Sequence, residues 1–153
     1  MVEIYWVGHP TFRVAVMPRP RGGDWLEEDI AGYRSAGVDV LVSLLEPAEV
    51  RILDLGQEEP LARAAGMEFI SFPIPDFGTP DSKSGAAEFI HRLAAFVKDR
   101  KGVAIHCKAG IGRSPTLAAC ALTAVGVPVD EALEALTLAR GWPVPETREQ
   151  RAW

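Results

Sequence analysis

The sequence predicts an α/β fold: a three-layer sandwich in which a central, mostly parallel sheet is flanked by helices. Segments rich in β-branched residues alternate along the chain with amphipathic segments of helical period. The run at 38–45 is almost continuously apolar, which is typical of a strand covered by helices on both faces. Because 153 residues are too few for two independent cores, we expect one domain spanning 1–153.

The first half of the chain predicts strands at 2–7, 11–16, 38–45 and 67–74 and helices at 24–36, 47–55 and 58–65. The first two strands are β-rich and are separated by Gly8-His9-Pro10, so we expect them to pair as a hairpin at one sheet edge. In the first helix, apolar residues recur at helical spacing among charged ones, and Gly37 suits the position just past its end. The fourth strand alternates apolar and polar residues.

The second half predicts helices at 84–100, 114–125 and 130–140, a strand at 103–105 and a glycine-containing loop at 107–113. The first helix carries a regular apolar stripe, whereas the second is apolar all round and should therefore be central. The last helix begins with acidic residues, has Arg140 in its last turn and is followed by Gly141, as the helix dipole and C-cap preferences require.

Composition excludes several functional classes. Lys and Arg total 16 against 21 Asp and Glu, and the resulting net charge of −5 disfavours general binding of nucleic acid or an anionic membrane. The most apolar run, at 117–129, is interrupted and too short to span a bilayer, so no transmembrane helix is expected. With two cysteines and no basic segment at the start, the sequence predicts a reducing, cytoplasmic location. Cys120 lies on the apolar helix and is expected to pack in the core.

The segment with the clearest chemistry is His106-Cys107-Lys108-Ala109-Gly110-Ile111-Gly112-Arg113-Ser114. A loop between a buried strand and a helix N-terminus turns backbone N–H groups toward one point, which suits a tetrahedral oxyanion. The two glycines permit a tight backbone, and Arg113 offers a planar fork to two anion oxygens. Cys107 lies where the same field favours a nucleophilic thiolate. The alternative, a buried structural thiol, does not account for the glycines, Arg113 and Ser114 that follow it.

This segment resembles the H-C-x-x-G-x-x-R-[S/T] phosphate loop of the protein tyrosine phosphatase superfamily, in particular its compact dual-specificity-like members. The resemblance implies a phosphatase-like fold, Cys107 as nucleophile, the loop from Lys108 to Arg113 as phosphate cradle, and no metal or other cofactor. It also implies that His106 orients the loop and helps to hold the thiolate, and that Ser114 assists departure of the sulfur.

The resemblance implies further residues outside the loop. Asp76, in the segment Pro73-Ile74-Pro75-Asp76-Phe77-Gly78-Thr79-Pro80, occupies the position of the family's general acid, with Asp81 as the competing carboxylate. The larger members have Trp where this chain has Ile74. Gln150 resembles a glutamine that positions the hydrolytic water, and Glu46 resembles a glutamate that lies near the phosphate-loop arginine in some compact members.

Three functions follow as hypotheses. The first is hydrolysis of phosphotyrosine, with phosphoserine and phosphothreonine as further substrates, so that the partner is a phosphorylated protein or a small phosphomonoester. The second is a phosphoinositide, nucleotide or RNA 5′-phosphatase with the same mechanism, for which Lys108 at the loop mouth would favour several phosphates. The third is a phosphate-binding module without catalysis. The oligomeric state is not predicted.

Overall fold

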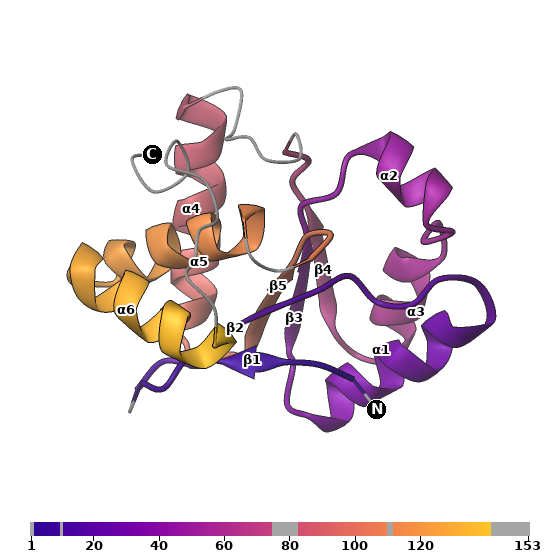
Figure 1. Ribbon diagram of the computed structural model, residues 1–153, viewed down its shortest axis with the longest axis horizontal. Coiled ribbons are helices and arrows are strands. Elements are labelled where there is room, and N and C mark those ends of the chain that lie inside the picture. Colours follow the sequence, from indigo (N-terminus) through magenta and orange to yellow (C-terminus); the bar gives the residue numbers. More distant parts are fainter. Residues whose placement is uncertain (1, 10, 75–82, 110–111, 142–153) are drawn as a thin grey trace.

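The computed structural model describes residues 2–9, 11–74, 83–109 and 112–141, and in them a five-stranded sheet lies between two groups of helices (Figure 1). The strands are β1 (Tyr5–Trp6), β2 (Val14–Met17), β3 (Val40–Ser43), β4 (Glu68–Ser71) and β5 (Val103–His106). The helices are α1 (Leu26–Ser35), α2 (Pro47–Ile52), α3 (Glu58–Ala64), α4 (Lys83–Lys98), α5 (Arg113–Ala124) and α6 (Val129–Arg140), and a 3-10 turn, Gly23–Trp25, precedes α1.

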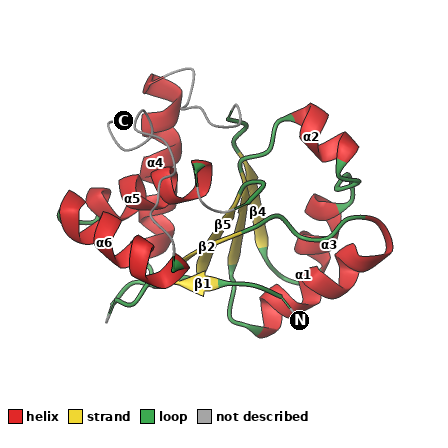
Figure 2. Ribbon diagram, in the orientation of Figure 1, coloured by secondary structure: helices red, strands yellow, loops and turns green. Residues whose placement is uncertain are grey.

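The sheet has the strand order β1-β2-β5-β3-β4. Only the β1–β2 pair at the edge is antiparallel, and the other three pairs are parallel. Figure 2 shows α4, α5 and α6 on one side of the sheet and α1, α2 and α3 on the other. The predicted α/β sandwich with its edge hairpin is therefore confirmed. Within the described residues, no helix is both long and apolar enough to cross a membrane.

The strands are shorter than their apolar runs. The run predicted as a strand at 38–45 forms ladder pairs only over Val40–Ser43, yet Val38, Leu44 and Leu45 are also at most 1% exposed. An apolar run in the sequence indicates which residues are buried, but a strand also needs hydrogen bonds to a neighbouring strand. The buried run therefore extends beyond the residues that pair in the sheet. The helix ends follow the sequence more closely: Gly37 and Gly141 both have positive φ, of 99° and 72°.

Side chains alternate across β5 into two separate cores. Val103, Ile105 and Cys107 belong to the core beneath α4, α5 and α6, whereas Ala104 belongs to the core beneath α1 and α3. A period of two residues places His106 on the same face as Ala104. The loop that follows β5 therefore begins with neighbouring residues, His106 and Cys107, that face opposite sides of the sheet.

The loops after the parallel strands meet at one edge of the sheet, as the carboxyl ends of parallel strands must. Backbone hydrogen bonds join them directly. The Leu44 N–H donates to the His106 carbonyl at 3.0 Å, the Ile74 N–H to the Leu44 carbonyl at 3.0 Å, and the Arg19 N–H to the Lys108 carbonyl at 3.2 Å. This edge thus holds the predicted phosphate loop among the ends of three neighbouring strands.

Candidate active site

Cys107 lies at the centre of this edge, where β5 passes into the loop before α5. Its side chain is only 3% exposed, and its Sγ is 3.4 Å from the Oγ of Ser114, within hydrogen-bond distance. Helix α5 starts at Arg113 and is 12 residues long, so its N-terminal partial positive charge is directed toward the sulfur. The sulfur thus lies between the buried hydroxyl of Ser114 and the start of a helix.

The first turn of α5 is anchored to its N-cap residue, Gly112. The carbonyl of Gly112 accepts hydrogen bonds from the Thr116 N–H at 3.3 Å and from the Thr116 hydroxyl at 2.8 Å. Ser114 and Thr116 are both buried, at 0% and 3% exposure. The hydroxyl of Ser114 is thereby presented to the sulfur rather than to solvent.

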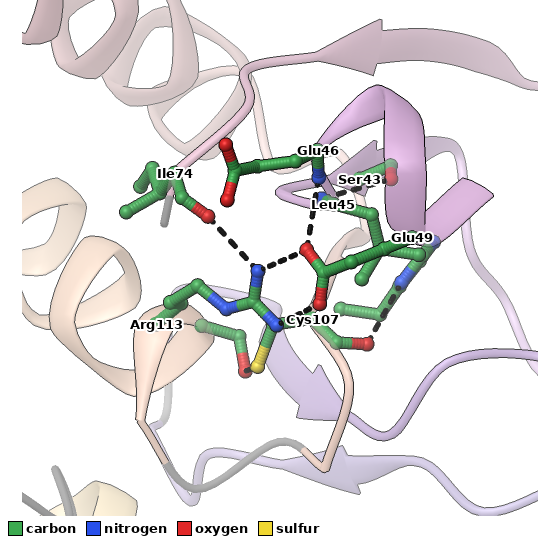
Figure 3. A network of polar contacts seen from close by, with 9 residues as sticks. Ser43, Leu45, Glu46, Glu49, Ile74, Cys107 and Arg113 are labelled. Atoms are coloured by element: carbon green, nitrogen blue, oxygen red, sulfur yellow. Dashed lines mark hydrogen bonds and ion pairs between the residues drawn. The ribbon is translucent and has the colours of Figure 1, made fainter. Parts of the chain in front are cut away.

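The guanidinium of Arg113 is held against α2 by a bidentate ion pair (Figure 3). Its Nη1 and Nη2 donate to the two carboxylate oxygens of Glu49 at 2.6 and 2.9 Å, and Nη1 also donates to the Ile74 carbonyl at 2.9 Å. Burial alone would raise the pKa of Glu49, but the hydrogen bonds from Arg113 and the Glu46 N–H together lower it, so this carboxylate is ionised at neutral pH. A fixed guanidinium plane beside the thiol is suited to phosphate.

The carboxylate that pairs with Arg113 is one that the sequence analysis did not single out; that analysis named Glu46 as lying near this arginine, which remains a prediction. The carboxylate that pairs with Arg113 belongs to Glu49, and Glu46 contributes its backbone N–H, which donates to Glu49 Oε1 at 3.0 Å. The reason is helical geometry: Glu46 is the N-cap of α2, and Glu49, three residues later, lies one turn into the helix. The spacing Glu46-x-x-Glu49 was the available signal for this arrangement.

His106 is completely buried and contacts two oxygen atoms. Its Nδ1 is 3.3 Å from the carbonyl oxygen of Cys107, and its Nε2 forms a short contact with the carboxylate of Glu58, itself 2% exposed. The sequence analysis did not find Glu58. Its signal was the spacing Leu55-x-x-Glu58-x-x-x-Ala62, which places a carboxylate between two buried apolar residues, Leu55 just before α3 and Ala62 within it.

Lys108 and Ala109 are exposed, and their carbonyls are bonded away from the thiol. The Lys108 carbonyl accepts from the Arg19 N–H, and the Ala109 carbonyl accepts from Nη2 of Arg140 at 3.2 Å. The Lys108 carbonyl and the Ala109 N–H belong to the same trans peptide, so they point in opposite directions. Because the carbonyl points toward Arg19, the Ala109 N–H points away from it, as an anion-binding loop requires. Lys108 also contributes to lowering the pKa of Glu49, so its charge acts on the side of the loop that faces α2.

Several predicted site residues lie outside the described residues: Asp76, its competitor Asp81, Gly110, Ile111 and Gln150. Their proposed roles remain predictions. The described chain does reach the segment of the predicted acid, because Ile74, whose carbonyl accepts from Arg113, precedes Asp76 by two residues.

The second cysteine has a different environment. Cys120 lies on α5 and is partly buried, and burial raises its pKa to about 11. It is therefore a neutral thiol at physiological pH, and neither cysteine forms a disulfide.

The sheet, the loop and the thiol are arranged as in the dual-specificity and protein tyrosine phosphatases. This arrangement defines the class of protein. The model of the family described as "Tc-R-P: Polymorphic toxin system, DSP-PTPase phosphatase" matches residues 15–127. The chain belongs to this family of dual-specificity-type phosphatase domains.

Curated relatives agree with this membership. Cyclin-dependent kinase inhibitor 3 of Rattus norvegicus is 32% identical over 133 residues, which cover 82% of this chain and 59% of the relative. Protein tyrosine phosphatase type IVA 2 of Mus musculus is 29% identical over 87 residues, covering 56% of this chain and 52% of the relative. The chain thus spans between half and three-fifths of the length of these relatives.

Solved structures share the fold over nearly the whole chain. A crystal structure of the active form of Tk-PTP superimposes with a TM-score of 0.75 at 28% identity, covering 97% of this chain and 91% of that one. A structure of kinase associated phosphatase, in which the catalytic cysteine is replaced by serine, gives a TM-score of 0.86 at 23% identity and covers 99% and 90%. The expected phosphatase-like fold is confirmed.

Proposed function

We propose that this chain hydrolyses phosphomonoesters through a phosphocysteine intermediate, with phosphotyrosine as substrate and phosphoserine and phosphothreonine as further substrates. The observation that carries the proposal is the placement of the Cys107 sulfur at the N-terminus of α5, 3.4 Å from the Ser114 hydroxyl. A buried cysteine could be inert, but the fixed Arg113 beside it supplies an anion-binding group that a structural thiol does not need.

In the first step, the thiolate of Cys107 attacks phosphorus, an S–P bond forms, and the bond to the ester oxygen breaks. Glu49 occupies the end-on fork of Arg113, formed by Nη1 and Nη2, so the fork proposed for phosphate is the side-on one formed by Nε and Nη2. Amides of the loop from Lys108 to Arg113 bind the remaining non-bridging oxygens. Asp76 donates its proton to the departing oxygen, which leaves as an alcohol or phenol.

In the second step, water attacks the phosphocysteine. Asp76, now a carboxylate, takes a proton from the water, which Gln150 positions. The S–P bond breaks, inorganic phosphate leaves, and the Ser114 hydroxyl donates a hydrogen bond to the returning thiolate. Side chains and backbone amides supply every group in both steps, so we expect turnover in the presence of a chelator.

Turnover of an aryl phosphate by variants of the two cysteines tests the proposal. The purified protein should release phosphate from p-nitrophenyl phosphate in EDTA. Cys107→Ser should lower kcat by roughly 10⁴-fold, because the hydroxyl is a poor nucleophile here, and should still bind a phosphotyrosine peptide. Cys120→Ser is the matched control and should retain wild-type turnover. Undiminished kcat in Cys107→Ser would refute the mechanism, and tight peptide binding by the wild type without phosphate release would favour the non-catalytic module.

A second candidate, a phosphoinositide phosphatase, has its own support. A structure of PTPMT1 in complex with PI(5)P has the same fold, with a TM-score of 0.70 at 22% identity, and Lys108 is exposed at the loop mouth of this chain. Against it stands the net charge of −5, which is unfavourable at an anionic membrane. Initial rates on phosphopeptides, soluble inositol phosphates, nucleotides and RNA 5′-phosphates separate these substrates, and a strong preference for the lipid headgroup would reverse the order of the two candidates.

We also propose a compartment for this activity. A catalytic thiol reacts only in its reduced form, and both cysteines are free, so we place the activity in the reducing cytoplasm.

A further inference from the structure

We propose that Arg140 is a positioning residue for the phosphate loop. Its guanidinium, oriented by the ring of Tyr5, holds the Ala109 carbonyl outside the loop and so keeps the loop in the conformation that binds an oxyanion. The inference rests on the proposed function, because it concerns how the loop that carries Cys107 is prepared for phosphate. It assigns a role to the last turn of α6, which neither chemical step uses.

Arg140 reaches the loop from a distant part of the chain. Its Nη2 donates to the Ala109 carbonyl at 3.2 Å, across 31 residues of sequence. Arg140 is the last residue of α6, beyond the apolar core, and it follows the fully buried Leu136 by four residues, a spacing that places both on one face of the helix. A last-turn arginine also complements the helix dipole, but the dipole alone requires no contact with a loop.

The ring of Tyr5 orients the guanidinium. The end of α6 lies beside β1 (Figure 1), and the guanidinium carbon of Arg140 is 4.3 Å from the centre of the Tyr5 ring, close enough for attraction between the cation and the ring face. Among the described residues, the buried Nε of Arg140 has no hydrogen-bond partner, so the ring and the Ala109 carbonyl are the contacts that orient this side chain. Tyr5 itself pairs with Val16 in the sheet and packs against the core.

Two consecutive carbonyls of the loop are held by donors outside it. The Lys108 carbonyl accepts from the Arg19 N–H and the Ala109 carbonyl from Arg140, both at 3.2 Å. The first donor is a backbone N–H, which any residue except proline would supply at position 19. The second donor is one particular side chain, so the direction of the Ala109 carbonyl is the part of the loop that a substitution can release.

The direction of this carbonyl matters for anion binding. A carbonyl oxygen carries partial negative charge, so a carbonyl that turned into the loop would repel the oxygens of a phosphate. A donor on the outer side lowers the free energy of the outward orientation before the anion arrives. Less of the binding free energy is then spent on rearranging the loop, which raises its affinity for phosphate.

The chain contains a matched arginine at the opposite edge of the sheet. Arg13 lies over the ring of Trp6, 5.2 Å from its centre, and its Nη2 donates to the Gly37 carbonyl at 3.2 Å. Gly37 precedes β3, whereas the phosphate loop follows β5, which is parallel to β3, so Gly37 lies at the other edge from the loop. Arg13→Ala therefore removes the same charge and the same kinds of contact as Arg140→Ala, but far from the loop.

The test is the affinity for tungstate, a tetrahedral oxyanion, measured by isothermal titration calorimetry alongside the melting temperature. Arg140→Ala should raise the Kd for tungstate about tenfold, because the loop loses a charged donor. Arg13→Ala should bind tungstate as the parent protein does. Unchanged affinity in Arg140→Ala, or an equal loss in Arg13→Ala, would overturn the proposal.

Substitutions of Tyr5 cover the case in which Arg140→Ala does not fold. Tyr5→Phe keeps the ring and should bind tungstate as the parent does. Tyr5→Leu keeps an apolar side chain but removes the ring face, and it should raise the Kd about threefold. In that case, equal Kd values for the two Tyr5 variants would overturn the proposal.

Tungstate binding does not require turnover, so the two proposals can fail separately. If Arg140→Ala weakens tungstate binding but the parent protein releases no phosphate from p-nitrophenyl phosphate, the proposed function fails and the role of Arg140 stands. If the parent turns over and Arg140→Ala binds tungstate equally well, the role of Arg140 fails and the proposed function stands.

Discussion

The two faces of the sheet differ in the kinds of residue that are buried against them. Beyond the first turn of α5, the face covered by α4, α5 and α6 is an apolar core. The face covered by α1 and α3 also has an apolar core, but it encloses the buried polar residues Asp29, Ser43, Glu58 and His106. Among the residues that the structure describes, the other buried polar residues, Arg113, Ser114 and Thr116, belong to the first turn of α5.

This difference assigns distinct tasks to the two faces. The α4–α6 face contributes packing, which holds α5 and therefore the N-terminus that faces the thiol. The other side contributes carboxylates, Glu58 from α3 and Glu49 from α2, which fix the histidine and the arginine of the phosphate loop. Changes on the first face should therefore cost stability, whereas changes to the carboxylates that contact the phosphate loop should cost activity.

The largest effect is expected from a cavity in the apolar face. Leu93 on α4 is fully buried, so Leu93→Ala should lower the free energy of unfolding by about 2–5 kcal/mol, measured by urea denaturation. The neighbouring exposed Arg92 supplies the control, Arg92→Ala, which should change stability by less than about 0.5 kcal/mol. The folded fraction of Leu93→Ala should keep the parent pH profile of kcat/KM, and a displaced profile would mean that the two faces are not separable.

A smaller effect, on activity, is expected at Glu49. Glu49→Gln replaces one of two acceptors by an N–H₂ group that cannot accept from Arg113, so the guanidinium is less firmly oriented. A lost hydrogen bond to a charged group should lower kcat/KM by about 10–100-fold. Glu46→Gln should lose clearly less, because the hydrogen bond that Glu46 donates to Glu49 comes from its backbone N–H, which the substitution keeps. Equal losses of kcat/KM in the two variants would show that the Glu46 carboxylate is as important for activity as that of Glu49.

The smallest effect concerns the ion pair of Asp29 with Arg21 on the α1 side, whose atoms are 2.6 Å apart. Burial alone would raise the pKa of Asp29, but hydrogen bonds from the Arg21 side chain and N–H together lower it below the usual 3.8. A lowered folded-state pKa contributes stability above the unfolded-state pKa, and this contribution is lost as the pH falls through the folded-state pKa.

Asp29→Asn should therefore lower the melting temperature by a few degrees at pH 7, and the difference from the parent should shrink as the pH falls below about 4. Thermal unfolding at pH 7, 5, 4 and 3 measures it. A pH-independent difference would show that the pair acts through packing rather than charge. Phosphatase activity at 25 °C should be unchanged, because Asp29 contacts Arg21 and not the phosphate loop.

Sequence reasoning was most successful where chemistry and local geometry coincide. The strand, glycine loop and helix around Cys107 are contiguous, so their arrangement followed from periodicity and helix N-terminal preferences. It was less successful for partners far along the chain. Arg113 and Glu49 are 64 residues apart, His106 and Glu58 are 48 apart, and no local pattern states which of the many acidic residues will meet them.

The sequence by itself determined the alternation of strands and helices, the edge hairpin and the loop that presents Cys107 beside Ser114. These features depend on neighbouring residues, whose apolar period and backbone preferences act before distant contacts form. The tertiary structure alone decided that Glu49 rather than Glu46 meets Arg113, and that Glu58 meets His106 inside the protein. A buried ion pair depends on which helix packs against which end of the sheet, and that is a property of the folded chain as a whole.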